Sequence, residues 1–183
     1  KMAGAGLCHT DLSIVDLGIE VNPYLGHEFV LGHENAGYIA ELGEGVEGVE
    51  VGEAVVVICT HFCNECDYCE SGNDNYCHCV TEICRGININ GGMAEYMVVP
   101  AYEVVPLGNV DPKIGVALAD AGLTSYAAAE QCAKYVKDDG YSVIIGVGGL
   151  GSYSLQYLKN ITKGKVIVVD TTEEKLERAI DKL

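Results

Sequence analysis

The chain has 183 residues, of which 49% are hydrophobic, and this is enough to bury the core of one large or two small domains. Acidic residues outnumber basic ones by 27 to 11, which gives a formal net charge of -16, and no run of Lys and Arg is present to follow a phosphate backbone. The longest apolar run, residues 54–59, is far short of the roughly 20 residues of a membrane helix, and no signal peptide is recognisable. We therefore do not expect nucleic acid or a membrane as a partner.

Residues 1–110 are expected to form a mostly β domain. Short β-like runs at residues 38–42, 54–59 and 93–100 are separated by glycine-containing turns, where a residue without a Cβ bends most easily. Each run is too short for an ordinary helix, so the pattern favours strands.

Four cysteines in this domain have the spacing C-x2-C-x2-C-x7-C: Cys63, Cys66, Cys69 and Cys77. Four thiolates at about 2.3 Å from zinc form a closed tetrahedral site with no position left for substrate, so a structural zinc lobe is predicted at residues 60–80. An iron–sulfur cluster is the rival metal, but its fourth cysteine follows after three residues and precedes Pro, whereas His78 follows Cys77. The other alternative is that the thiols are simply buried or paired as disulfides.

A helical connector is expected at residues 111–138, because Asp111 can cap a helix that has Pro112 at its first position. Gly122 is expected to interrupt this helix, and Thr124 to cap a second one that continues to residue 137.

Residues 139–183 have the pattern of a βαβ unit followed by a helix. A buried strand is expected at residues 141–145, a glycine turn at 146–151, a helix at 152–160 and a second strand at 165–169. Thr171 and Glu174 are expected to form a capping box for a helix at residues 173–183.

The turn carries the G-x-G-x-x-G fingerprint of dinucleotide sites. Gly146 would allow the sharp turn, Gly148 would let the backbone approach a pyrophosphate, and Gly151 would permit close packing of helix on strand. Asp170, at the end of the next strand, would accept the ribose hydroxyls. The alternative is an ordinary glycine-rich turn in which Asp170 only caps the last helix.

The chain resembles the zinc-dependent medium-chain alcohol dehydrogenases. The resemblance covers essentially the whole sequence and is carried, in chain order, by GLCHTD at residues 6–11, GHENAG at 32–37, the four-cysteine lobe, GMAEY at 92–96, DAGLT at 120–124 and GVGGLG at 146–151. It implies an α/β fold in which a GroES-like β domain precedes a Rossmann (doubly wound) domain. Only two strands of the Rossmann domain occur before residue 183, so this domain is expected to be incomplete, and the chain is expected to be truncated at both ends.

The resemblance implies a catalytic zinc held by Cys8, His33 and Asp120, with a fourth position open. Many family members have Cys at the third position, and this chain resembles the branch with Asp, whose carboxylate supplies the same single charge. The resemblance also implies that Asp11 orients His33; the alternative, on local sequence, is a carboxylate that caps a helix. Glu34 is expected as an alternative or transient ligand.

His33 is preferred over His27 as the ligand. Both residues stand in a Gly-His-Glu sequence, but only the second of these continues as x-x-Gly into a strand, as the family motif does. His27 is therefore expected to be a loop histidine without metal.

The implied reaction is hydride transfer between a primary or secondary alcohol, or its carbonyl product, and NAD. Thr10 would relay the alcohol proton, and Ser13 stands where well-known members carry a His that passes the proton on. The resemblance assigns cofactor contacts to the following residues: His9, Thr124, Gly146, Gly148, Gly149, Leu150, Gly151 and Asp170.

Two function classes remain open at this point, an NAD-dependent zinc alcohol dehydrogenase and a non-catalytic zinc-binding remnant or fragment of one. Continuation of the gene beyond residue 183 would distinguish them. The complete protein is expected to be a homo-oligomer. Because the nine cysteines include a metal-type set, a reducing compartment, and hence the cytoplasm, is expected. Four cysteines match no ligand position and are interpreted as small buried hydrophobic residues: Cys59, Cys79, Cys84 and Cys132.

Overall fold

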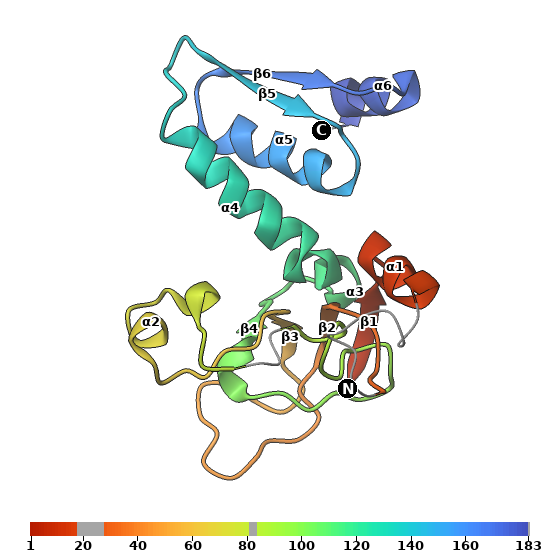
Figure 1. Cartoon of the computed structure of the whole chain (residues 1–183), viewed down its shortest axis with the longest axis vertical. Coiled ribbons are helices and arrows are strands. Elements are labelled where there is room, and N and C mark those ends of the chain that lie inside the picture. Colours follow the sequence, from red (N-terminus) through yellow and green to blue (C-terminus); the bar gives the residue numbers. More distant parts are fainter. Residues whose placement is uncertain (18–27, 81–83, 183) are drawn as a thin grey trace. The chain divides into compact units, whose positions relative to one another are not determined.

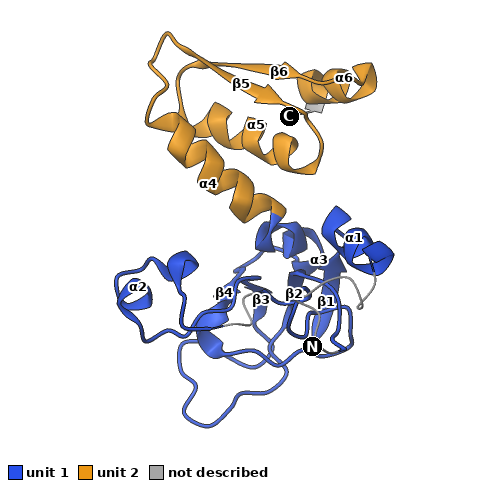
Figure 2. Ribbon diagram, in the orientation of Figure 1, with its two compact units in different colours: residues 1–120 blue, residues 121–183 orange. Residues whose placement is uncertain are grey.

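A computed structural model describes residues 1–17, 28–80 and 84–182 of the chain. The chain divides into two compact units, residues 1–120 and 121–183, which are coloured separately in Figure 2.

Unit 1 is built on a four-stranded antiparallel sheet (Figure 1). Its strands are adjacent in chain order: β1 (Met2–Gly6), β2 (Glu34–Tyr38), β3 (Ala54–Val57) and β4 (Val104–Pro106). Ala36 of β2 pairs with Val56 of β3, and both pack against Ala119 in the core of the unit. The sheet therefore positions the segments that enter and leave its strands, and these segments carry the site residues.

Short helices surround this sheet. They are α1 (His9–Leu17), α2 (Asp67–Glu70), α3 (Pro112–Gly115) and three 3-10 turns at Asp74–Tyr76, Ala101–Glu103 and Val116–Ala119. The predicted cap is confirmed, since the Asp111 side chain accepts a hydrogen bond from the Lys113 backbone N–H at 2.9 Å with Pro112 in the first turn. Helix α1 was not predicted, because its nine residues show no clear apolar periodicity.

A buried ionic cluster fixes the base of the cysteine lobe. Glu103 is fully buried, and its carboxylate contacts the Arg85 guanidinium on one oxygen and the His61 ring on the other. The neighbouring Tyr102 hydroxyl donates to the carbonyl of Phe62 at 3.1 Å, directly before the first lobe cysteine. Removing one partner of such a buried cluster costs about 3–5 kcal/mol, so the base of the lobe is strongly held by the protein itself.

Unit 2 is a parallel βαβ unit with flanking helices. Its elements are α4 (Ala121–Ala133), β5 (Tyr141–Ile145), α5 (Gly149–Ile161), β6 (Lys165–Val169) and α6 (Glu173–Lys182). The strands pair in parallel, and one core joins residues from α4, β5, the turn after β5, α5 and α6: Ala129, Ile144, Val147, Leu155, Leu158 and Ala179. The incomplete Rossmann fold predicted for this region is confirmed.

The opposite face of the β5–β6 sheet is open. Residues 141–145 were predicted as a fully buried strand, but burial alternates, and Val143 and Ile145 are 57% and 85% exposed. Parallel sheets normally have both faces covered, whereas the described helices cover one. This face is therefore unpartnered within residues 121–183.

Several predicted boundaries are wrong. The first predicted strand, residues 38–42, is displaced, because β2 begins at Glu34 and ends at Tyr38. Residues 93–100 form no strand in the described structure, although the Met2 N–H donates to the Glu95 carbonyl at 3.0 Å. Gly122 does not interrupt a helix, since tertiary packing keeps α4 continuous from Ala121 to Ala133 and leaves Thr124 inside its first turn. Helix α5 begins at Gly149 rather than at residue 152, because the glycines of the motif themselves form its first turn.

None of the helices in the described ranges combines the length and the apolar character required to span a bilayer.

Candidate metal centres and cofactor loop

Three side chains of unlike chemistry meet in unit 1. Cys8 lies between β1 and α1, His33 directly precedes β2, and Asp120 follows the Val116–Ala119 turn. Because Gly6 of β1 pairs with Glu34 of β2, Cys8 and His33 emerge at the same end of the sheet. The sulfur, the ring nitrogen and a carboxylate oxygen all lie within 4.8 Å of one another, and His33 Nε2 is 3.5 Å from Asp120 Oδ2.

This group has the donor set and spacing of a zinc site. Zinc binds nitrogen and carboxylate oxygen at about 2.0–2.2 Å, which in a tetrahedron separates the two donors by about 3.4 Å. The observed 3.5 Å between His33 and Asp120 fits that value without rearrangement. Three protein donors also leave one tetrahedral position open, as in catalytic sites.

The buried carboxylate of Asp11 contacts the segments that carry Cys8 and His33. Its side chain is 1% exposed, Oδ2 accepts from the Cys8 N–H at 2.8 Å, and Oδ1 accepts from the Gly32 N–H at 3.3 Å. The same Oδ1 is 3.4 Å from His33 Nδ1, which has no partner of good hydrogen-bond geometry among the described residues. The resemblance predicted that Asp11 orients His33, and the geometry places the carboxylate where it can do so.

Gly32 is required by this arrangement. Its φ is +95°, a backbone conformation that residues with a Cβ rarely adopt, and a Cβ here would lie 2.8 Å from Cγ of Met93. The turn directs the Gly32 N–H toward Asp11 and the next side chain, His33, toward Asp120.

The side chains of the group shift one another's pKa values. Contact with Asp120 raises the pKa of His33 to about 9, Cys8 and Asp11 add to this, and burial opposes it. Burial alone would raise the pKa of Cys8, but hydrogen bonds from the Thr10 backbone and His33 lower it overall. Without metal the imidazole is therefore protonated at neutral pH, and a cation that binds here must displace that proton.

The other residues that the resemblance assigns to this site do not all contact the Cys8–His33–Asp120 group. Thr10 is close, since its Oγ1 accepts from Cys8 Sγ at 3.7 Å. His9 is exposed at the start of α1, and the Ser13 hydroxyl donates to its carbonyl at 3.1 Å. Glu34 lies against Gly6 and is not a member of the group. His27 lies outside the described residues.

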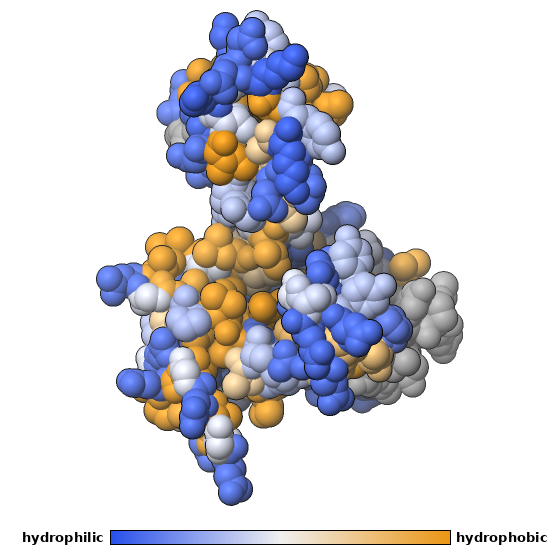
Figure 3. All heavy atoms as spheres, turned by 90° about the vertical axis from the view of Figure 1, so that its left-hand side faces the viewer, coloured by the Kyte–Doolittle hydropathy of each residue, from blue (hydrophilic) through white to orange (hydrophobic). Residues whose placement is uncertain are grey.

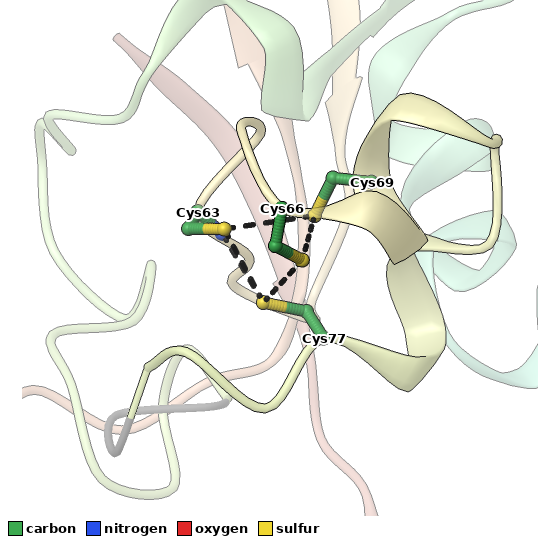
Figure 4. Close-up of side chains that lie close together, drawn as sticks. All are labelled: Cys63, Cys66, Cys69 and Cys77. Carbon is green, nitrogen blue, oxygen red and sulfur yellow. Dashed lines mark hydrogen bonds between the residues drawn. The ribbon is translucent and has the colours of Figure 1, made fainter.

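The four lobe cysteines also converge, as Figure 4 shows. The sulfur of Cys63 lies 3.8 Å from that of Cys69 and 3.6 Å from that of Cys77, and the sulfur of Cys66 lies 3.5 Å and 4.0 Å from the same two atoms. Four sulfurs at about 2.3 Å from one zinc are separated by about 3.8 Å, so the observed cluster has the size of a zinc–thiolate tetrahedron. The backbone N–H of Cys63 donates to Cys77 Sγ at 3.5 Å, and with the N–H of Cys79 it lowers the pKa of Cys77 to about 6.

A fifth thiol was missed by the sequence analysis. Cys79 is exposed and its side chain interacts with those of Cys66 and Cys63, which together with burial, the larger effect, raises the pKa of Cys79 to about 11. Its position two residues after Cys77 was the available signal, but the four-cysteine spacing is complete without it.

In unit 2 the glycine motif forms the predicted turn between β5 and α5. Gly146 has φ +88°, and a Cβ on Gly151 would lie 2.0 Å from the Gly146 carbonyl oxygen, so the close helix-to-strand contact requires glycine there. A Cβ on Gly148 or Gly149 would meet no protein atom, so the space beside the helix N-terminus is open to a ligand. Leu150, in the same turn, accepts at its carbonyl from the Ser125 hydroxyl at 2.9 Å.

Asp170 connects this turn to the last helix. Its Oδ2 accepts from the Val147 N–H at 2.9 Å and its Oδ1 from the Thr172 N–H at 3.0 Å, and these bonds lower the pKa of Asp170. The Nζ of Lys175 is 3.8 Å from Oδ1. Lys175 was not singled out by the sequence, although its place in the first turns of the helix after Asp170 could have indicated it.

Comparison with known proteins identifies the family. The family model of the alcohol dehydrogenase GroES-like domain matches residues 1–109. The chain belongs to the zinc-dependent medium-chain alcohol dehydrogenase family. A D-arabinose 1-dehydrogenase (NADP(+)) of Saccharolobus solfataricus is 39% identical over 171 residues, which are 92% of this chain and 48% of that relative.

Solved alcohol dehydrogenases have the same fold. The Aeropyrum pernix enzyme is 38% identical, with a TM-score of 0.87 over 98% of this chain and 53% of that one. A cobalt- and zinc-bound alcohol dehydrogenase from Pyrobaculum aerophilum is 31% identical, with a TM-score of 0.74 over 81% of this chain and 44% of that one. The chain thus spans about half the length of these relatives.

The two metal centres should respond differently to substitution. In Asp120→Ala we expect loss of one of two zinc ions with the fold retained, because the two remaining donors are anchored by the sheet. In Cys66→Ser we expect loss of the other zinc and a destabilised lobe, because the metal would link the four thiols on which its two short helices converge. Elemental analysis and thermal unfolding measure both effects. Cys132→Ser, outside both centres, is the matched control, and an unchanged zinc content in Asp120→Ala would contradict the assignment.

Asp11→Asn should lower the pKa of His33 in the metal-free protein, because the Asp11 carboxylate is one of the charges that raise it. A lowered pKa means that less of the imidazole is protonated at neutral pH. Titration of the histidine side chains by NMR measures the shift. Asp16→Asn removes an exposed carboxylate from the same helix and should leave His33 unchanged; an equal shift in both variants would rule out a specific contact.

Proposed function

We propose that the protein containing this chain is a zinc-dependent dehydrogenase that transfers hydride between a primary or secondary alcohol and NAD. The proposal depends on one observation. The donor atoms of Cys8, His33 and Asp120 lie within 4.8 Å of one another, beside the buried carboxylate of Asp11. The metal-bound relative and the other dehydrogenase relatives support it. The D-arabinose relative widens the range of alcohols to be considered.

Zinc would be held catalytically by Cys8, His33 and Asp120, and structurally by the four lobe cysteines. The catalytic ion would supply Lewis acidity to the oxygen of the alcohol. Cys8 and Asp120 would contribute two negative charges and His33 a neutral nitrogen, so the donor set neutralises the ion. In the lobe all tetrahedral positions are taken by protein sulfur, and no role in the reaction is left for it.

Thr10 would take up the proton of the alcohol. Its hydroxyl oxygen accepts from the Cys8 thiol in the metal-free protein, and it is released as an acceptor once Cys8 is a thiolate, which has no proton to donate. The hydroxyl is then able to accept a proton from the substrate and to donate its own onward. Ser13 is not arranged to continue the relay, because its hydroxyl donates to the His9 carbonyl within α1.

Asp170 favours NAD over NADP. Its lowered pKa keeps the carboxylate charged, which suits ribose hydroxyls and opposes the additional phosphate of NADP. Among the described residues Lys175 forms an ion pair with Asp170, and this pair offsets only part of the repulsion. The relative from Saccharolobus solfataricus is an NADP(+) enzyme by its description, so the preference is a property to be measured for this chain.

Asp170→Asn should narrow the preference for NAD, because it removes the charge while leaving an oxygen to accept from the Val147 N–H. Two like charges about 4 Å apart repel by about 1–4 kcal/mol, so the ratio of kcat/KM values should change by at least about fivefold. Steady-state kinetics with both cofactors measure it. Asp181→Asn, on the same last helix, is the control. An unchanged ratio of kcat/KM values would mean that Asp170 only caps the last helix and does not select the cofactor.

The experiment that tests the proposal is a substrate panel of primary, secondary and sugar alcohols with the full-length protein, following reduction of NAD. We expect turnover that is lost in Asp120→Ala and retained in Cys132→Ser. Activity that survives Asp120→Ala would refute the catalytic role of this group.

A second candidate, a non-catalytic zinc-binding piece, is favoured for residues 1–183 in isolation by the open β5–β6 face. Exposed apolar strands promote association, so this piece should aggregate and show no turnover. Size-exclusion chromatography and the same panel measure both, and turnover by the purified piece would contradict this second candidate.

We further propose a homo-oligomeric protein of the cytoplasm that acts on small molecules. Unit 1 has an apolar face, visible in Figure 3, and a groove of about 660 Å³ whose lining includes Tyr38, Val46, Val55 and Val98. Apolar surface of this kind commonly lies in contacts between subunits. The nine unpaired cysteines fit a reducing compartment.

A further inference from the structure

Two cysteines without an assigned role lie side by side in unit 1. Cys59 directly follows the residue after β3, and Cys84 lies 25 residues later in the chain, beyond the cysteine lobe. Thr60 and Cys84 form an antiparallel β-bridge, and the Arg85 N–H donates to the Cys59 carbonyl at 2.9 Å. The two backbone segments are therefore paired around the two cysteines, each of which lies opposite the residue next to the other.

This pairing brings the two cysteines close together. Cys84 pairs with Thr60, so Cys59 lies diagonally across from Cys84, one residue from the directly opposite position. Cα atoms of directly opposite residues in an antiparallel pair lie about 4.5–5.5 Å apart, and a disulfide joins Cα atoms about 4.4–6.8 Å apart. The side chains of Cys59 and Cys84 contact each other. Both thiols are free and half-buried.

The two thiols also influence each other. Interaction with the Cys84 side chain lowers the pKa of Cys59 to about 7, and the same contact, with burial, raises the pKa of Cys84. One sulfur is therefore readily ionised while its neighbour keeps a proton. A thiolate beside a protonated thiol is the arrangement found in reactive dithiols.

We propose that Cys59 and Cys84 are a reversible oxidation site, at which a peroxide converts the two thiols into a disulfide beside the Cys8–His33–Asp120 group. The Cys59 thiolate attacks one oxygen of the peroxide, the O–O bond breaks, and the sulfur becomes a sulfenic acid. The Cys84 sulfur then attacks Cys59 Sγ and displaces hydroxide, which takes up the Cys84 proton. The two thiols lose two electrons in total, and hydrogen peroxide is reduced to two molecules of water.

The site lies close enough to the metal group to affect it. The charges of Asp120 and His33 both act on the Cys59 thiol. Oxidation removes the Cys59 negative charge and replaces two adaptable thiols by one rigid bridge. If the proposed function holds, oxidation should lower the rate of alcohol turnover, and a dithiol reductant should restore this rate.

Mapping of the cross-link tests the site without any measurement of turnover. The zinc-loaded full-length protein is treated with hydrogen peroxide, free thiols are alkylated, and the protein is digested without reductant. Cleavage after Glu and after aromatic residues separates Cys59, in residues 54–62, from Cys63, and places Cys84 in residues 83–95. We expect these two peptides to be linked, and to be released and alkylated after treatment with dithiothreitol.

Controls make the outcome decisive. Cys84→Ser should abolish the link and leave the Cys59 peptide unlinked, whereas Cys132→Ser should leave the link intact. Zinc content should be unchanged by the dose used, which shows that the lobe thiols have not been consumed. Alkylation of both Cys59 and Cys84 in the oxidised wild type, or links that involve only lobe cysteines, would overturn the proposal. A dehydrogenase without this link refutes the oxidation site alone, and a link in a protein without turnover refutes only the proposed function.

Discussion

The arrangement of unit 1 depends on one buried carboxylate. Burial of an isolated charge is strongly unfavourable, yet Asp11 is 1% exposed, so the surrounding structure must supply donors for it. The Cys8 N–H and the Gly32 N–H each donate to one of its oxygens, and His33 Nδ1 faces the carboxylate. These partners come from the residue before α1 and from the entry to β2, so satisfying one charge also fixes two of the three proposed metal ligands. The site is therefore organised by protein contacts before a metal binds.

The two candidate metal centres differ in how far the protein builds them in advance. In the Cys8–His33–Asp120 group, sheet pairing and Asp11 hold the donors in place. What remains unfavourable is the closeness of two acidic side chains, which the protonated His33 compensates. In the lobe, four sulfurs cluster on short elements whose own helices have three or four residues. Apart from the sulfurs, the base of the lobe is held by the buried contacts of Glu103 with Arg85 and His61, and within the lobe Tyr68 contacts the rings of Tyr76 and His78. A metal in the lobe thus replaces the core that so small a segment lacks.

The sequence was most informative where the signal is local. Cysteine spacing, the Asp111–Pro112 cap and the glycine motif each lie within 15 residues, and the structure contains the corresponding lobe, helix start and turn. Family resemblance supplied the long-range group, since nothing local connects Cys8 with Asp120. The strand at residues 93–100 was wrong because β-like composition does not provide a pairing partner. The proximity of Cys59 and Cys84 could not be predicted either, because it arises from a bridge between segments 25 residues apart.

Asp170 shows how one residue can satisfy both interpretations that the sequence allowed. An ionised carboxylate offers about four acceptor positions, and the Val147 and Thr172 amides occupy two of them. The first bond holds the glycine turn, and the second holds the start of α6. The Thr172 side chain and Lys175 also act on this carboxylate, so a ribose would share its oxygens with these groups. Because the side chain is only 6% exposed, a ribose could reach it only beside the turn that Asp170 itself holds. In the proposed cofactor site, recognition of the cofactor and the stability of this turn would therefore be coupled through a single side chain.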